Sequence, residues 1–238
     1  EAALSFHLAS KLDSSTISAL SLRDLFHEAY RSDPYIGEAA REDIGAVCSR
    51  DPACTGYSDI LLYYKGYHAL QAYRIAHYFW NQDRKSLARY LQSRISEVFA
   101  VDIHPAARIG MGILIDHEGS DTYKGLRRVQ GHAVVIGETA VVEDNVSMLH
   151  EVTLGGTGKT SGDRHPKIRE GVLISAGAKI LGNVEVGRNA KVGGGAVVLE
   201  DVPENTTVVG VPARIVGKTL HSHPSLEMDH RFFVEDEE

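Results

Sequence analysis

Two stretches of the chain bring together side chains that can do acid–base and anion-binding chemistry. The first, VDIHPAARIGMGILIDH, contains Asp102, His104, Asp116 and His117. The second, GGTGKTSGDRHPKIREG, contains Lys159, Asp163, Arg164 and His165 among several glycines. A neutral imidazole can take a proton, and a guanidinium can pair with a carboxylate through two hydrogen bonds. What these side chains can do together depends on the elements that position them.

A six-residue repeat of aliphatic side chains runs through the second half of the chain. Its members are Ile103, Ile109 and Ile115, then Ile136, Val142, Met148 and Leu154, then Ile168, Ile174, Ile180, Val186, Val192 and Val198. A period of six fits neither an α-helix nor a simple alternating strand, so it predicts a solenoid of short strands and turns. One aliphatic side chain per hexad then points inward. The repeat breaks at 116–135 and 155–167, and loops that leave a solenoid are where binding and chemistry concentrate.

Residues 1–100 carry the patterns of α-helices. Asp33-Pro34 predicts an N-cap followed by the first residue of a helix, and Asp51-Pro52 predicts a break. The stretch SDILLYYKGYHALQAYRIAHYFWNQ is apolar on more than one face, which predicts burial between helices or subunits. Glycine becomes frequent only after residue 108, so we expect a domain boundary near 97–103. The last residues lose all periodicity and end in an acidic run, which predicts a mobile or partner-docking arm.

Composition excludes several classes of function. The formal net charge of -7 argues against binding a nucleic-acid backbone, which needs a basic face. No apolar run is long enough to cross a membrane, and the first residues do not form a secretory signal. Only Cys48 and Cys54 are present, which favours a reducing, cytoplasmic setting. The two cysteines could pair, but we expect free thiols.

Several strings of the chain, taken together, resemble the serine acetyltransferases of cysteine biosynthesis. They are VDIHPAA, IDH, VVIGETAVV, TLGGTGK, GDRHPKIREGV, GVPARIVGK and the helical DILLYYKGYHALQAYRIAHYFWNQ. The resemblance implies an α+β fold: an N-terminal all-α domain (1–100), a left-handed parallel β-helix (101–217) and a flexible C-terminal tail (218–238). It also implies transfer of the acetyl group of acetyl-CoA to the hydroxyl of L-serine, by direct attack and without a metal.

The resemblance implies a role for each polar residue at the serine end of the site. His117 would take the hydroxyl proton, and Asp102, fifteen residues earlier, would accept a hydrogen bond from the other ring nitrogen. Arg164 would pair with the substrate carboxylate, assisted by His165. Asp116 and Asp51 would bind the ammonium group.

At the acetyl-CoA end, the resemblance assigns backbone amides and small side chains to an extended groove. Gly156, Thr157 and Ala176 would line the pantetheine arm, which must lie against backbone. Lys159 would bind a coenzyme phosphate.

Each of these residues also has a structural interpretation. A histidine beside an aspartate is commonly structural, Asp102 could cap a turn, and Asp51 before Pro52 could be an N-cap. Arg164 could pair with Asp163, and the glycines around 155–158 could serve turns. Other functions also remain open: acetylation of another hydroxyl acceptor such as homoserine, a metal hydratase, or a non-catalytic binding protein. The hydratase needs converging histidines, and no His-x4-His spacing occurs.

Two departures from the family pattern concern possible partners. The string EGSDTYKGLRRVQGHA follows His117 directly, and it could form a lid, contact a neighbouring subunit or lie in solvent as a surface insertion. The chain ends in VEDEE rather than in the family's Gly-Ile, which puts docking of cysteine synthase in doubt. The resemblance further implies trimers paired into a hexamer through the helical domains, and feedback inhibition by L-cysteine.

Overall fold

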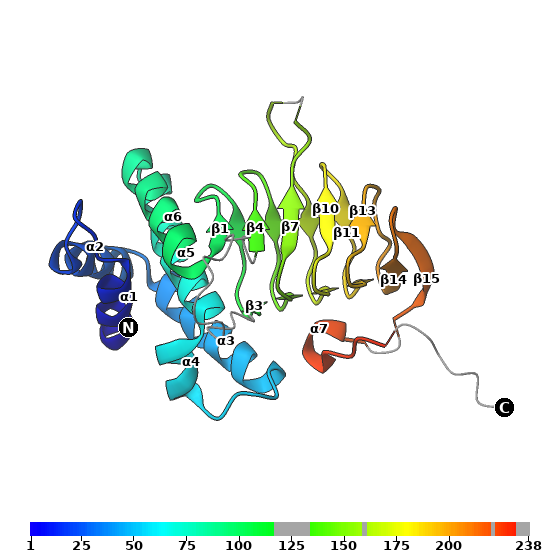
Figure 1. Cartoon of the computed structure of the whole chain (residues 1–238), viewed down its shortest axis with the longest axis horizontal. Coiled ribbons are helices and arrows are strands. Elements are labelled where there is room, and N and C mark those ends of the chain that lie inside the picture. Colours follow the sequence, from blue (N-terminus) through cyan, green and yellow to red (C-terminus); the bar gives the residue numbers. More distant parts are fainter. Residues whose placement is uncertain (117–133, 159–160, 220–221, 232–238) are drawn as a thin grey trace, which may run out of the picture.

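The computed structural model describes residues 1–116, 134–158, 161–219 and 222–231 (Figure 1). Six helices come first: α1 (Ala2–Leu12), α2 (Ala19–Ser32), α3 (Pro34–Arg50), α4 (Tyr57–Tyr63), α5 (Lys65–Asn81) and α6 (Lys85–Phe99). They gather at one end of a long stack of strands. The side chain of Asp33 accepts a hydrogen bond from the amide of Tyr35, and Pro34 is the first residue of α3, which confirms the predicted N-cap. Within the described ranges, no helix is both long and apolar enough to cross a bilayer.

The strands wind through three sheets in turn. They are β1 (Val101–Ile103), β2 (Arg108–Ile109), β3 (Leu114–Ile115), β4 (Val134–Ile136), β5 (Val141–Val142), β6 (Ser147–Met148), β7 (Val152–Gly155), β8 (Lys167–Ile168), β9 (Leu173–Ile174), β10 (Lys179–Leu181), β11 (Glu185–Val186), β12 (Lys191–Val192), β13 (Val197–Val198), β14 (Thr206–Val209) and β15 (Arg214–Lys218). Sheet A has the order β1-β4-β7-β10-β13, sheet B β11-β8-β5-β2 and sheet C β15-β14-β12-β9-β6-β3. All pairings are parallel except that of β14 with β15. The chain therefore forms a three-sided prism.

The aliphatic residues of the six-residue repeat fill the prism. Every member is buried, from fully enclosed Leu154 to Ile109, which is 8% exposed. The structure adds a second buried column two residues before the first, with members such as Ala107, Val146 and Ala178. Side chains two apart in an extended strand point to the same side, so each short strand places two residues inward. The predicted inward positions were therefore correct, but each hexad places two side chains inward rather than one.

The turns between sheets form the corners of the prism. At the A–B corner the chain passes from sheet A to sheet B, for example between β4 and β5 and between β7 and β8. At the C–A corner it passes from sheet C to sheet A, as between β6 and β7 and between β9 and β10. The described residues of the loop between β7 and β8 project away from the coils (Figure 1). The insertion that follows His117 lies outside the described residues.

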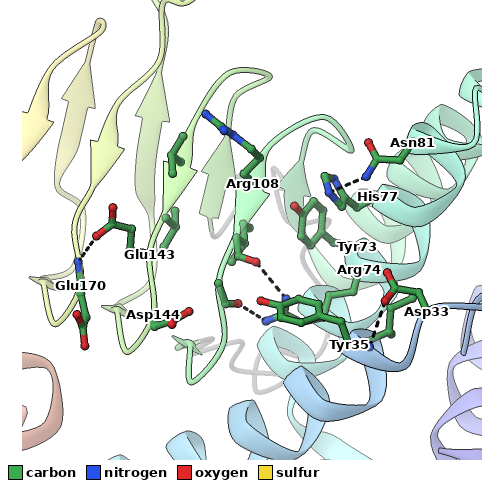
Figure 2. A pocket seen from close by; sticks show the side chains of 15 residues that line it. Asp33, Tyr35, Tyr73, Arg74, His77, Asn81, Arg108, Glu143, Asp144 and Glu170 are labelled. Atoms are coloured by element: carbon green, nitrogen blue, oxygen red, sulfur yellow. Dashed lines mark hydrogen bonds between the residues drawn. The ribbon is translucent and has the colours of Figure 1, made fainter.

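The helices cover the open end of the first coil and satisfy its backbone. The buried side chain of Arg74 donates to the carbonyls of Ile109 and Gly110, at 3.2 and 2.6 Å, where β2 ends (Figure 2). Arg50, the last residue of α3, donates to the carbonyl of Gly112 at 2.9 Å. His77 contacts the carbonyl of Pro105 at 2.7 Å. Unpaired carbonyls in a buried turn are costly, so these contacts fix the helices on the solenoid.

An ion pair that is shut off from solvent links α3, α5 and the first coil. The Oδ2 atom of Asp43 accepts from Arg74 at 2.7 and 3.0 Å and from Gln71 at 2.9 Å, while its Oδ1 accepts from the amide of Ile113 at 2.9 Å. Asp43 is 0% exposed and Arg74 4%. Both oxygens of the carboxylate accept hydrogen bonds, which offsets the desolvation of the charge.

An open cavity of about 470 Å³ lies beside this junction (Figure 2). It is bordered by Tyr35 and His77 from the helices and by Arg108, Glu143 and Asp144 from the solenoid. None of the predicted site residues is among the described residues that line it.

Helix α5 is buried by its own chain. Twelve of its seventeen residues, from Gly66 to Phe79, are shielded from solvent, and α5 packs on α6, α2, α3, β1 and β3. This confirms the predicted burial. It also means that the apolar stretch does not by itself call for a second subunit. The exposed apolar side chains of the helical region lie elsewhere, at Phe6, Leu20, Tyr57 and Tyr63 among others.

Part of the segment predicted as a tail lies against the prism. The segment contains a short helix, α7 (Pro224–Glu227), and the buried hydroxyl of Ser147 on β6 donates to the carbonyl of Ser225 at 2.8 Å. Further along, Lys191 on β12 donates to the carbonyl of Arg231 at 2.6 Å. The described residues 222–231 therefore run across sheet C.

The buried ion pair predicts a large difference between two substitutions. Asp43→Ala should lower the free energy of unfolding by about 3–5 kcal/mol, because it leaves the Arg74 guanidinium buried without its partner. Glu28→Ala removes an exposed pair with Arg84, held at 2.8 Å, and should cost about 0–1 kcal/mol. Urea unfolding of both variants measures the difference. Equal losses would show that the junction does not depend on the Asp43 carboxylate.

Candidate active site

The A–B corner holds two of the predicted serine-binding residues, Arg164 and His165, on one threonine. The hydroxyl oxygen of Thr139, which follows β4, accepts from the amides of Arg164 and His165 at 3.0 and 3.1 Å. The same hydroxyl lies 2.8 Å from Nδ1 of His165. One side chain from the coil below therefore shapes the turn that presents both residues.

The contacts of His165 define its protonation. The amide of Thr139 donates to Nδ1 at 3.2 Å, so that nitrogen is an acceptor and the ring proton lies on Nε2. Burial, with the neighbouring Arg164 next in effect, lowers the pKa of His165, so the ring is neutral at neutral pH. Its Nε2 lies against the backbone of Gly137 and Gly156, where an added Cβ would come within 2.0 and 2.8 Å. These positions accept only glycine without moving the ring.

The guanidinium of Arg164 is part-exposed and sits 3.4 Å from Glu138. Among the described residues, the ion pair of Arg164 is with Glu138 and that of Asp163 is with Lys167, so the alternative Arg164–Asp163 pair is not found. Asp163 instead accepts from Lys167 at 2.6 Å, and that bond holds the pKa of Asp163 below its usual range. Lys167 also donates to the carbonyl of His165 at 2.7 Å, which ties down the base of the turn.

Asp102 lies on the outer face of sheet A, in the middle of β1, and a helix holds it. The Nε2 atom of Gln92 on α6 donates to its Oδ1 at 2.7 Å. Asp102, Gln92 and His104 line a cavity of about 680 Å³ between α6 and the first coil. Burial lowers the pKa of His104, and the charges of both Asp102 and Arg164 act on this ring. Asp102 thus lies on the side of the prism that leads to the A–B corner, and it does not cap a turn.

Of the two predicted ammonium-binding residues, Asp116 lies at the C–A corner and Asp51 lies at the end of α3. Asp116 follows β3, and its Oδ2 lies 3.5 Å from Nδ1 of His150, which occupies the same corner one coil later. Asp51 ends α3 as its C-cap rather than serving as an N-cap, and its Oδ1 accepts from the amide of Ala53 at 2.8 Å.

Helix α5 connects these two aspartates. The Tyr64 side chain hydrogen-bonds to Asp51, and burial, with the charge of Asp51 next in effect, raises the pKa of Tyr64 to about 12. Two residues on, a Cβ at Gly66 would come within 2.1 Å of the carbonyl of Ile115, the residue before Asp116. The start of α5 therefore brings the loop of Asp51 close to the end of β3.

The residues predicted to bind acetyl-CoA also divide between the two corners. Gly156 and Thr157 follow β7 at the A–B corner, and Ala176 follows β9 at the C–A corner. His117 and Lys159 lie outside the described residues. Among the described ranges, no three His, Cys, Asp or Glu side chains converge as metal ligands would.

Sequence reasoning missed three side chains that position the predicted residues: Gln92, Thr139 and His150. Gln92 acts across two domains, so no local pattern marks it. Thr139 and His150 each stand at a corner one coil away from a predicted residue, and counting residues from the hexads on both sides of the breaks would have placed them.

Comparison with known proteins decides the family. A family model described as "Serine acetyltransferase, N-terminal" matches residues 1–72, and one for six bacterial transferase hexapeptide repeats matches residues 165–200. The serine acetyltransferase of Salmonella typhimurium is 57% identical over 230 residues, which are 97% of this chain and 80% of that protein. The chain belongs to the serine acetyltransferase family. The enzyme therefore transfers the acetyl group of acetyl-CoA to L-serine and gives O-acetyl-L-serine for cysteine biosynthesis.

Solved serine acetyltransferases share the architecture. A structure in complex with cysteine has a TM-score of 0.89 at 54% identity and covers 97% of this chain and 84% of its own. The soybean enzyme complexed with serine gives 0.84 at 58% identity, covering 91% and 84%. The Brucella abortus enzyme in complex with coenzyme A gives 0.84 at 52%, covering 92% and 82%. These matches confirm the predicted left-handed parallel β-helix behind an N-terminal helical region.

The organisation of the Arg164–His165 turn leads to a prediction about Thr139. Thr139→Val removes the acceptor of two backbone amides and should lower the free energy of unfolding by about 1–3 kcal/mol. Thr139→Ser keeps the hydroxyl oxygen and should stay within about 0.5 kcal/mol of the parent. Urea unfolding of the two variants measures the contrast. If serine and valine behaved alike, the hydroxyl would not be what holds the turn.

Proposed function

We propose that His117 takes the proton of the serine hydroxyl, and that Asp102 orients this imidazole and balances the positive charge that it gains. We also propose that each serine site is shared by two neighbouring chains. The observation that carries the proposal is the division of the substrate-binding residues between two corners of one prism. Arg164 and His165 lie at the A–B corner, whereas Asp116 lies at the C–A corner, close to which the start of α5 brings the loop of Asp51.

The chemistry needs only a base and a good leaving group. A neutral imidazole within hydrogen-bond reach of the serine hydroxyl takes its proton as the oxygen attacks the thioester carbonyl. The tetrahedral intermediate then collapses, the carbon–sulfur bond breaks, and the coenzyme thiolate takes up a proton. Attack is direct, so no enzyme nucleophile is needed. Cys48 and Cys54, at the end of α3 and in the loop after it, have no part in this step.

The position of Asp102 suits the orienting role. Its Oδ1 accepts from Gln92, which fixes the plane of the carboxylate and leaves Oδ2 for the ring N–H of an imidazole. A carboxylate in that position keeps the imidazole in the tautomer that can accept a proton, and it stabilises the imidazolium that forms. Because Gln92 belongs to α6, the helical domain contributes directly to the geometry of the base.

The charges of the two corners suit the two ends of an amino acid. The Arg164 guanidinium can form a bidentate pair with the serine carboxylate, and the Asp51 and Asp116 carboxylates can accept from its ammonium group. When prisms pack side by side around a threefold axis, the A–B corner of one chain meets the C–A corner of the next. A homotrimer then completes three equivalent sites, with Gly156, Thr157 and Ala176 of the two chains lining the arm of acetyl-CoA and Lys159 reaching a phosphate.

Inhibition and assembly follow from the same arrangement. L-Cysteine has the same carboxylate and ammonium groups as L-serine, so it should compete for Arg164 and the two aspartates as a feedback inhibitor. A related enzyme has been solved in complex with cysteine, which supports this proposal. A dimer of trimers and a cytoplasmic location stay predictions, and docking of cysteine synthase stays an open alternative.

Removal of the base tests the proposed chemistry. His117→Ala should lower kcat by about 10²–10⁴, the usual contribution of a positioned general base, with little change in acetyl-CoA affinity. His223→Ala, at an exposed position on the tail, serves as the matched control and should retain full kcat. The thiol released from acetyl-CoA in the presence of serine is the measure. A His117→Ala enzyme that turns over at the parent rate would exclude this imidazole as the base.

The contact between Gln92 and Asp102 gives a second prediction. Gln92→Ala should lower kcat about tenfold, because the carboxylate loses its orientation, while the KM for serine stays near the parent value. Gln92→Glu puts a like charge beside Asp102 and raises the pKa of that carboxyl, so activity should fail at a higher pH on the acid side. Ser93→Ala, beside the same cavity, is the control. If both Gln92 variants kept the parent kcat and the parent pH profile, Gln92 would not be the residue that orients Asp102.

A further inference from the structure

Two thiols meet beside the loop that carries Asp51. Cys48 lies in the last turns of α3 and Cys54 in the loop that follows, and both are half-buried free thiols, as expected from the sequence. Their Sγ atoms are 3.1 Å apart. The proposed transfer reaction uses neither of them. We propose that Cys48 and Cys54 are a dithiol modification site that small disulfides oxidise to an intramolecular disulfide, and that this bond weakens serine binding by displacing Asp51.

The reaction is a balanced thiol–disulfide exchange. The thiolate of either cysteine, for example that of Cys54, attacks one sulfur of a low-molecular-weight disulfide RSSR, the S–S bond breaks, and RS⁻ leaves and takes up a proton. The Cys48 thiol then loses its proton to solvent and attacks Sγ of Cys54, which releases the second RS⁻. Two protein S–H groups are replaced by one S–S bond, and RSSR is reduced to two RSH. No metal or enzyme-bound oxidant is required.

The contact between the two thiols suits this exchange. The two Sγ atoms are in contact at 3.1 Å, so either thiol can supply the thiolate and the other can resolve the mixed disulfide. The thiolate is the attacking species, and the thiol beside it resolves the mixed disulfide. Because the resolving thiol is already in contact, the mixed disulfide should be short-lived.

Closure of the bond must move the loop rather than the helix. A disulfide needs sulfurs about 2.0–2.1 Å apart, so the two atoms must approach by about 1 Å. Helix α3 is fixed just beyond Cys48, because Arg50 donates to the carbonyl of Gly112 at 2.9 Å and to Ser147 Oγ at 3.1 Å. The shift therefore falls on the residues that follow Arg50.

Asp51 joins the fixed helix to the part that moves, because its own amide donates to the carbonyl of Val47 at 2.9 Å. The amide of Cys54 donates to the carbonyl of Asp51 at 3.0 Å, and the amide of Ala53 donates to the Asp51 carboxylate at 2.8 Å. A pull on Cys54 is therefore transmitted to Asp51 through one tight turn. Displacements of this size are enough to weaken a positioned contact. This second half of the inference rests on the proposed role of Asp51 in binding the serine ammonium group.

The test treats the full chain with oxidised glutathione, which avoids releasing cysteine, and then removes the reagent. The parent should lose the mass of two hydrogens and gain no adduct, whereas Cys48→Ser should keep one glutathione on Cys54. The KM for serine should rise about fivefold in the oxidised parent, whereas the KM for acetyl-CoA should change less than about twofold. Dithiothreitol should remove the internal disulfide and restore the parent KM for serine. Cys48→Ser without oxidant should keep the parent KM for serine.

Two results would overturn the inference. One is a parent chain that forms only glutathione adducts and no internal bond, and the other is a complete bond with an unchanged KM for serine. Asp51→Asn, measured under reducing conditions, separates this failure from that of the proposed function. If that variant raises the KM for serine about tenfold or more, Asp51 binds substrate whatever the thiols do. If it does not, the proposed role of Asp51 is wrong, and the mass measurement still decides whether the dithiol is a site.

Discussion

The six-residue coil is the constraint on which the rest of the structure depends. Two inward side chains per hexad build two buried columns, and those columns fix the register of every turn. Once the register is fixed, a residue's place in the hexad decides whether it lies on a flat face or at a corner. Arg164 and Asp116 therefore reach different corners for reasons of packing, before any substrate is considered. The chemistry is distributed by the same repeat that builds the core.

The helical domain completes the first coil. A stack of strands ends in a row of unpaired backbone groups, and here donors from Arg50 and Arg74 satisfy the carbonyls of the turns. The same set of helices holds Asp102 through Gln92 and places Asp51 beside the end of β3. Stability and function are therefore coupled at one junction: whatever loosens α3, α5 or α6 also disturbs residues that we assign to the site.

Sequence could predict the features that depend on local pattern. The hexads gave the inward positions from Ile103 to Val198, Asp33-Pro34 gave the start of α3, and the shared motifs gave the family. What sequence could not give depends on how separate elements pack. Gln92 meets Asp102 only because α6 crosses the first coil at one particular angle, and the burial of α5 inside its own chain could not be told from burial at an interface. The second inward column was missed because the strand alternation inside each hexad is hidden by the longer repeat.

The central claim is that each serine site takes Arg164 from one chain and Asp116 from its neighbour. Mixed oligomers of two inactive variants test it most directly. Arg164→Ala and Asp116→Ala chains, each purified and inactive alone, are unfolded together in equal amounts and refolded. If the site is shared, about a quarter of the sites in randomly mixed cyclic trimers carry both native residues, so about a quarter of the parent activity should return. If all the residues act within one chain, the mixture should stay as inactive as its parts, which would contradict the account.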